Sequence, residues 1–256
     1  MELPLVFCLA IFCAKKEDVS LEESISISQA VLDVFKSTPT YFGADYDNKL
    51  KIKYYKSIDE LRKNAGERLT FFSCSEESFR KREQCITELR FYPGKKHPLL
   101  KVSKEYKELG CFTNQDLMII RNILLAHGFK AISVNGFFMK NHNDAHLFGG
   151  GIGVSKLSSD ESKTGESLTY PPDLEKKIWD AFWMFYASKT IINDKIRERF
   201  IKVLDKINAL YIEDKYGISI QLPVDYDEAA VNKESLIPYK KVLREWLRHE
   251  GLILRV

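Results

Sequence analysis

The run "LPLVFCLAIFCA", from Leu3 to Ala14, is apolar at nearly every position. A buried β-strand and a secretory signal are the two interpretations of such a run. The basic residues Lys15 and Lys16 follow the run instead of preceding it, and Glu2 stands where a signal carries positive charge. The run is also too short to span a bilayer. We therefore predict a buried strand, and we find no other transmembrane candidate in the chain.

A helix is predicted directly after this strand, in "SLEESISISQAVLDVF" (residues 20–35). Ser20 followed three residues later by Glu23 is the pattern of a capping box, which satisfies free backbone amides at a helix start. Apolar residues then recur at helical spacing as far as Phe35, and Pro39 follows. The sequence thus predicts a strand that leads into an amphipathic helix.

The rest of the first half reads as alternating strands and helices. Period-two alternation predicts a half-buried strand in "KLKIKYYK", with its lysines toward water. Capping patterns at Ser57 and at Thr113 predict two more helices. The predicted elements are strands at 49–56, 68–75 and 84–93 and helices at 57–66 and 114–128.

The spacing of apolar residues changes from that of a helix to that of strands in the segment "FKAISVNGFFMKNHNDAHLFGGGIGVS" (residues 129–155). Asn135 and Gly136 separate two apolar runs, and the favoured tight hairpin turn needs positive φ at both central residues. A second turn is predicted at residues 140–144. We therefore predict a meander of three strands here.

The C-terminal part is predicted to be largely helical. Residues 156–172 are polar and rich in Ser and Gly, as in a linker. Helices are predicted at 173–187, 194–210 and 234–251, with a strand at 217–223. The expected fold is α+β, a mostly antiparallel sheet with packed helices. We predict one domain, 1–256; the alternative is a division near 156–172 into a sheet-rich part, 1–155, and a helical part, 173–256.

The histidine and glycine segment at residues 142–153 is the stretch that most resembles a ligand site. His142 and His146 are four apart, but Asn143 stands where the metalloprotease pattern has its glutamate. Val154 follows Gly153 where a phosphate-binding loop has lysine. Turn and strand are the better interpretation, so we predict no metal and no cofactor.

Catalytic and redox motifs are also absent from the sequence. The five cysteines include no CxxC pair, which fits a reducing cytoplasm, and each lies in an apolar or strand-like pattern typical of a buried thiol. There is no GxSxG nucleophile elbow. A net charge of +3 among 39 basic and 36 acidic side chains does not indicate nucleic-acid binding. We predict no catalytic residues, no enzymatic activity and no direct contact with nucleic acid.

Two stretches interleave tyrosine with acidic residues, at 41–56 and 223–234. Exposed tyrosine between carboxylates suits a protein interface, because tyrosine brings contact area at low entropic cost and carboxylates steer a basic partner. A solvated turn is the alternative. The candidate partner-binding residues are Asp45, Tyr46, Asp47, Asp225, Tyr226, Asp227 and Glu228.

The order of these pieces resembles the immunity protein 52 family of bacterial polymorphic toxin systems. The likeness lies in "SLEESISISQAVLDVF", "PTYFGADYDNK" (39–49), "KSIDELRKNAG" (56–66), "HGFKAISVNG" (127–136), "AHLFGGGIG" (145–153) and "YPPDLEKKIWDAF" (170–182). The resemblance implies an α+β fold and a protein that binds and neutralises a cognate toxin, with a nuclease as the expected toxin.

We therefore expect a cytoplasmic, non-catalytic protein-binding factor. The alternative is an enzyme that acts on nucleic acid or on a phosphorylated substrate. Such an enzyme would use the lysines between Lys49 and Lys56, together with carboxylates that only the fold brings together.

Overall fold

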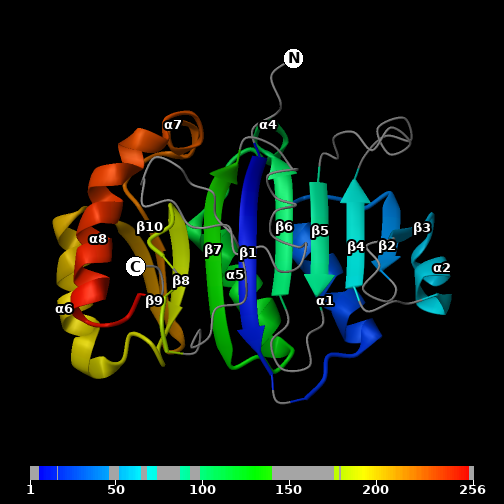
Figure 1. Cartoon of the computed structure of the whole chain (residues 1–256), viewed down its shortest axis with the longest axis horizontal. Coiled ribbons are helices and arrows are strands. Elements are labelled where there is room, and N and C mark those ends of the chain that lie inside the picture. Colours follow the sequence, from blue (N-terminus) through cyan, green and yellow to red (C-terminus); the bar gives the residue numbers. More distant parts are fainter. Residues whose placement is uncertain are drawn as a thin grey trace.

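The computed structural model of the chain describes residues 6–15, 17–45, 52–64, 68–73, 87–92, 99–139, 176–178 and 180–253. Within these residues the fold is α+β, as predicted, and is built on one ten-stranded antiparallel sheet (Figure 1). The strand order is β3-β2-β4-β5-β6-β1-β7-β8-β10-β9. The strands are β1 (Val6–Ala14), β2 (Tyr41–Asp45), β3 (Ile52–Tyr55), β4 (Arg68–Ser73), β5 (Thr87–Tyr92), β6 (Leu99–Glu105), β7 (Ala131–Met139), β8 (Met184–Ser188), β9 (Leu210–Asp214) and β10 (Gly217–Gln221).

Helices lie on both faces of the sheet. Adjacent residues of a strand point to opposite faces: on β9, Asp214 forms an ion pair with Arg121 of α5, whereas Glu213 forms one with Arg197 of α6. The helix α5 therefore packs on one face and α6 on the other. The helical elements are α1 (Leu21–Val34), α2 (Ile58–Lys63), α4 (Tyr106–Leu109), α5 (Asn114–Ala126), α6 (Asp194–Lys206), α7 (Tyr226–Val231), η2 (Lys233–Leu236) and α8 (Ile237–His249).

The first strand confirms the prediction for the opening apolar run. All nine residues of β1 are buried, because β6 and β7 flank it and both of its faces are covered. Phe7, Leu9 and Ile11 belong to the main hydrophobic core. Within the described residues, no helix is both long and apolar enough to cross a membrane.

The predicted caps account for the helix starts. The Ser20 side chain accepts a hydrogen bond from the Glu23 amide at 3.1 Å, but the Glu23 carboxylate contacts Lys15 Nζ at 2.5 Å instead of closing the capping box. Thr113 and Asp116 form a complete capping box at the start of α5. At the other end of α1, the buried Lys104 ammonium donates to the Phe35 carbonyl oxygen at 2.7 Å, so a lysine satisfies a free helix carbonyl.

The predicted hairpin at Asn135 and Gly136 is wrong. Both residues lie within the continuous strand β7, where Asn135 pairs with Ala10 and Gly136 with Leu9. A Cβ at position 136 would lie 3.1 Å from the Phe7 ring. The glycine therefore makes room for an aromatic side chain of the neighbouring strand and does not supply a turn. The rest of the predicted meander, 140–155, lies outside the described residues.

The predicted helix at 173–187 is also wrong. Met184–Ser188 is strand β8, which is buried at all five positions. A central strand covered on both faces is a continuous apolar run, and hydrophobic spacing alone does not separate such a run from a buried helix. The aromatic residues of this segment also favour strand geometry. The helices predicted at 194–210 and 234–251 are present as α6 and α8, and the strand predicted at 217–223 is present as β10.

Strand β8 pairs with β7, so the sheet joins parts of the chain on either side of residues 156–172. Those residues themselves lie outside the described part. The single-domain assignment stays a prediction, which an unfolding experiment can test.

The cysteine predictions hold in part. Cys8 and Cys13 are buried thiols, and burial raises the pKa of Cys13. Cys111 is exposed, contrary to expectation, because it lies in the short connection between α4 and α5 and not in a strand. Cys74 and Cys85 lie outside the described residues.

Candidate protein-binding surface

The two predicted partner-binding stretches differ in how far the structure describes them. Asp45 is the last residue of β2, while Tyr46 and Asp47 lie outside the described residues. The second stretch is fully described and forms the start of α7. The structure does not place Asp45 beside this second stretch, because β2 lies near the opposite end of the sheet from α7 (Figure 1).

The acidic residues of the second stretch form the first turn of a helix. Asp225 is the N-cap, and its carboxylate accepts the Glu228 amide at 2.7 Å. Asp227 and Glu228 occupy the first turn, where the free amides of a helix start favour negative charge. Asp225 and Asp227 are exposed and Glu228 is half-buried. Three carboxylates are therefore fixed on one turn, and two of them face solvent.

Tyr226 anchors this turn and is not the exposed aromatic residue that the sequence predicted. Its side chain is 8% exposed. The ring packs against Phe138 at a centroid distance of 5.1 Å and against Trp183 at 5.8 Å, at one end of an aromatic cluster that includes Phe7 and Phe112. Burial raises the pKa of the Tyr226 phenol. The prediction failed because tyrosine between carboxylates looks the same in sequence whether it faces a partner or the core.

The half-buried Tyr106, from α4, completes the surface. Its ring stacks on Tyr226 at 5.5 Å, and its hydroxyl donates to Asp227 Oδ1 at 3.0 Å. This hydrogen bond raises the pKa of Tyr106. The helices α4 and α7 lie beyond the same ends of the strands (Figure 1), and the stacked rings of Tyr106 and Tyr226 connect them. We call Tyr106, Asp225, Asp227 and Glu228 the acidic rim.

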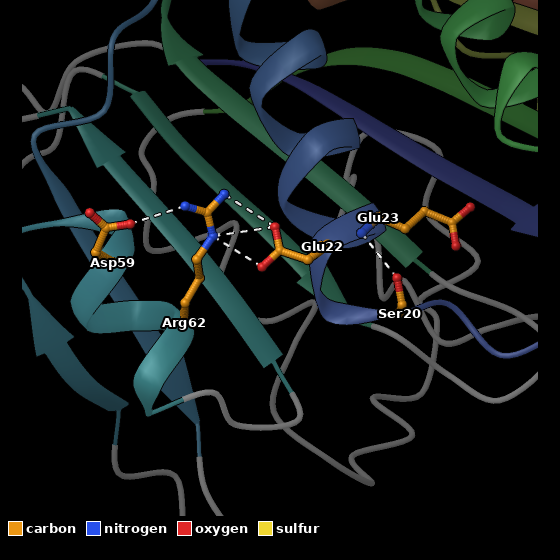
Figure 2. A network of polar contacts seen from close by, with 5 residues as sticks. All are labelled: Ser20, Glu22, Glu23, Asp59 and Arg62. Carbon is orange, nitrogen blue, oxygen red and sulfur yellow. Dashed lines mark hydrogen bonds and ion pairs between the residues drawn. The ribbon is translucent and has the colours of Figure 1, made fainter.

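A second polar cluster, at the start of α1, has a structural role. Figure 2 shows Arg62 of α2 between two carboxylates: its Nε donates to Glu22 of α1 at 3.0 Å and its Nη1 to Asp59 at 3.0 Å. The hydrogen bond to Glu22 raises the pKa of Arg62, and the hydrogen bond to Asp59 has the next largest effect in the same direction. All three side chains are well exposed. The cluster ties α2 to α1, and its acids Glu22 and Asp59 lie in the first turns of these helices.

The described residues give no candidate metal site. They contain no group of three His, Cys, Asp or Glu side chains that could hold a metal ion. The segment with His142 and His146 lies outside the described residues, as do Lys49 and Lys51. Lys56 is exposed, and its backbone amide donates to Glu60. Of the predicted partner-binding residues, Asp225, Asp227 and Glu228 lie together on the acidic rim.

Comparison with known proteins finds a likeness among solved structures alone. No family model matches the chain, and no curated protein matches its sequence. Among solved structures, the chain is similar to the T6SS protein PA0821 of Pseudomonas aeruginosa, with 14% sequence identity and a TM-score of 0.48. The alignment covers 85% of this chain and 68% of that chain. The proposal of function therefore rests on the residues of this chain, and membership of the immunity protein 52 family stays a prediction.

Proposed function

We propose that this protein is a non-catalytic binding protein that neutralises a cognate bacterial toxin, acting as an immunity protein in the cytoplasm. The observation that carries the proposal is the acidic rim, in which exposed carboxylates stand on a turn that a buried tyrosine fixes to the sheet. The sequence resemblance to immunity protein 52 supports the same function. The toxin class that best fits an acidic surface is a nuclease, whose active site binds a polyanion.

The rigidity of the rim favours binding. Asp225 is held by its capping hydrogen bond and Asp227 by the Tyr106 hydroxyl, so both carboxylates are ordered before any partner arrives. Less conformational entropy is then lost on association than with free side chains. Carboxylates that face a basic cleft also accelerate encounter, most strongly at low salt. The rim would bind across the toxin's active site and exclude its substrate, with no chemical step on this chain.

The test is association with the toxin encoded beside this protein's gene, measured by stopped-flow fluorescence at two salt concentrations. Asp225→Asn together with Asp227→Arg keeps an N-capping side chain at position 225 while it removes the net negative charge of the rim. We expect an association rate at least about tenfold lower at low salt. Toxin inhibition in a nuclease assay should weaken in parallel.

The matched control is Glu198→Lys on α6. It makes a similar change of net charge at an exposed site away from the rim, where Glu198 contacts Lys202. Its association rate should stay close to that of the wild type. Equal rates for the rim variant and the wild type would remove the acidic rim from the proposal. Binding without any inhibition of the toxin would refute the immunity function itself.

A further inference from the structure

The edge of the sheet at β9 carries an unusual share of exposed apolar surface. Among the described residues, five large hydrophobic side chains are exposed, and two of them border this edge. Leu210, at the start of β9, is 60% exposed, and Tyr216, just after the strand, is 43% exposed. An edge strand with such flanks is a template for pairing with another strand.

The hydrogen bonds of β10 show which groups of β9 face outward. The Leu222 amide donates to Trp183 O, and Lys189 N donates to Tyr216 O on the same side of β10. In an antiparallel sheet, the backbone amide and carbonyl groups of successive residues point alternately toward one neighbouring strand and toward the other. Residues 217, 219 and 221 of β10 therefore face β9, where they pair with 214, 212 and 210. The amide and carbonyl groups of Tyr211 and Glu213 consequently point away from the sheet.

The sequence of this edge is complementary to itself. In an antiparallel pair of β9 strands centred on Ile212, Ile212 lies opposite its own copy, Tyr211 lies opposite Glu213, and Leu210 opposite Asp214. The outward groups of Tyr211 and Glu213 then form two hydrogen-bonded pairs around a central pair without hydrogen bonds, as an antiparallel ladder requires. A shift toward the start of β9 is blocked, because Asn208 has a φ of +54° and ends the strand.

The charges of the edge also fit this register. No carboxylate lies opposite another, whereas a register centred on Glu213 would place two glutamates face to face. Each acid already has a cation within its own chain, since Glu213 pairs with Arg197 and Asp214 with Arg121. The strand therefore presents little net charge to a second copy.

We propose that two copies of this chain associate through antiparallel pairing of their β9 strands about a two-fold axis at Ile212, extending one sheet into the next. Isologous pairing of this kind closes on itself and forms a dimer instead of a filament. The exposed apolar residues Leu210 and Tyr216 flank the seam. This inference is independent of the acidic rim, which lies on different elements.

The test is the mass of the full-length protein in sedimentation equilibrium as a function of concentration. The wild type should rise from 29.7 kDa toward twice that mass. Ile212→Lys and Ile212→Glu each place two like charges face to face, so each variant alone should have a dimer dissociation constant at least about tenfold higher. An equimolar mixture of the two variants should dimerise again, because lysine then lies opposite glutamate.

Val231→Lys is the matched control. It adds the same charge at an exposed apolar residue of α7, away from β9, so the dimer should persist. Far-UV circular dichroism melts establish that each variant is folded. A wild-type chain that keeps the monomer mass at every concentration would overturn the inference, as would variants whose mixture stays monomeric. Loss of the dimer in Val231→Lys would show that the added charge acts away from β9, and would overturn the pairing at Ile212.

Discussion

At the scale of single residues, close packing in the fold explains two glycines whose role the sequence pattern does not reveal. Gly136 was predicted in a turn because Asn-Gly is a strong hairpin signal. In the fold, the Phe7 ring occupies the space above it. Gly217 has a related role: a Cβ there would lie 2.6 Å from the Tyr186 hydroxyl and would also clash with the Ala187 carbonyl. Both glycines depend on partners far away in the sequence, so local spacing could not reveal their purpose.

Arg121 and Asp214 give a prediction about pH at this scale. Arg121 is 1% exposed and lies over the rings of Tyr186 and Tyr216. Burial raises the pKa of Asp214, but hydrogen bonds from Arg121 and from the Tyr216 amide outweigh burial, so the pKa lies below its usual value. The pair therefore stabilises the fold above the pKa of an unfolded aspartate, about 4, and this contribution is lost as pH falls through the lower, folded pKa.

We expect Asp214→Asn to lower the free energy of unfolding by about 2 kcal/mol at pH 7, a value reduced from that of a fully buried pair because Asp214 is partly exposed. The difference from wild type should shrink as pH falls below about 4, where the wild type protonates the same group. Urea unfolding at pH 7 and pH 3 measures both values. Asp194→Asn, in an exposed pair with Lys189, should change little at either pH. A difference for Asp214→Asn that does not vary with pH would contradict this account.

At the scale of elements, the sequence predicted the capped helices α1, α2 and α5 and the buried strand β1, but it missed the buried strand β8 and the capped helix α7. The starts of α1 and α5 could be predicted from Ser20 and Thr113, because a capping hydrogen bond joins residues only three apart in the sequence. Strand β8 has no such marker, and its uniform burial removes the alternation that identifies a strand. Strand β9 was not predicted, and the helix predicted at 194–210 reaches only its first residue. Only its pairing with β10 defines it.

The pair of Asp180 and Arg244 links the segment before β8 to α8 and gives a prediction about that element. The Nε and Nη2 atoms of Arg244 each donate to the Asp180 carboxylate at 2.6 Å, and the Asp180 side chain is 1% exposed. Arg244→Met leaves this charge buried without its main cation, so the free energy of unfolding should fall by about 3–5 kcal/mol. Chemical denaturation monitored by circular dichroism measures the change.

The matched control for Arg244→Met is Arg62→Met. It removes an arginine with two carboxylate partners at the exposed cluster of Figure 2, where ion pairs contribute little to stability, so no resolvable change is expected. The double variant Asp180→Leu with Arg244→Met should recover part of the lost stability, because it removes both charges together. Equal losses for the two single arginine variants would show that burial of Asp180 is not the cause.

At the scale of the whole molecule, the acidic rim shows how far sequence reasoning about the site could reach. Asp225, Asp227 and Glu228 were predicted from the sequence, either as an interface or as a solvated turn, and the structure places them at the start of helix α7. Tyr106 was missed, because it is 121 residues from Asp227 and only the fold brings them together. Local chemistry can thus be predicted from sequence, whereas which face a tyrosine presents depends on the packing of the complete sheet.

The same packing predicts that the described parts of the chain unfold together. The hydrophobic core is one cluster. It includes Leu89 of β5 and Phe71 of β4 as well as Phe200 of α6 and Leu243 of α8. All three tryptophans lie in the C-terminal part, so their fluorescence reports on that part alone, while far-UV circular dichroism reports on the whole chain. We expect both signals to give the same transition midpoint in urea.

Two core substitutions make this test decisive. Leu89→Ala on β5 should lower the midpoint seen by tryptophan fluorescence, although no tryptophan lies in residues 1–155. Leu243→Ala on α8 should lower the midpoint seen by circular dichroism by a similar amount. Each removes a fully buried leucine and should cost about 2–5 kcal/mol. If Leu89→Ala left the fluorescence transition in place, the chain would instead consist of two units that unfold separately, divided near residues 156–172.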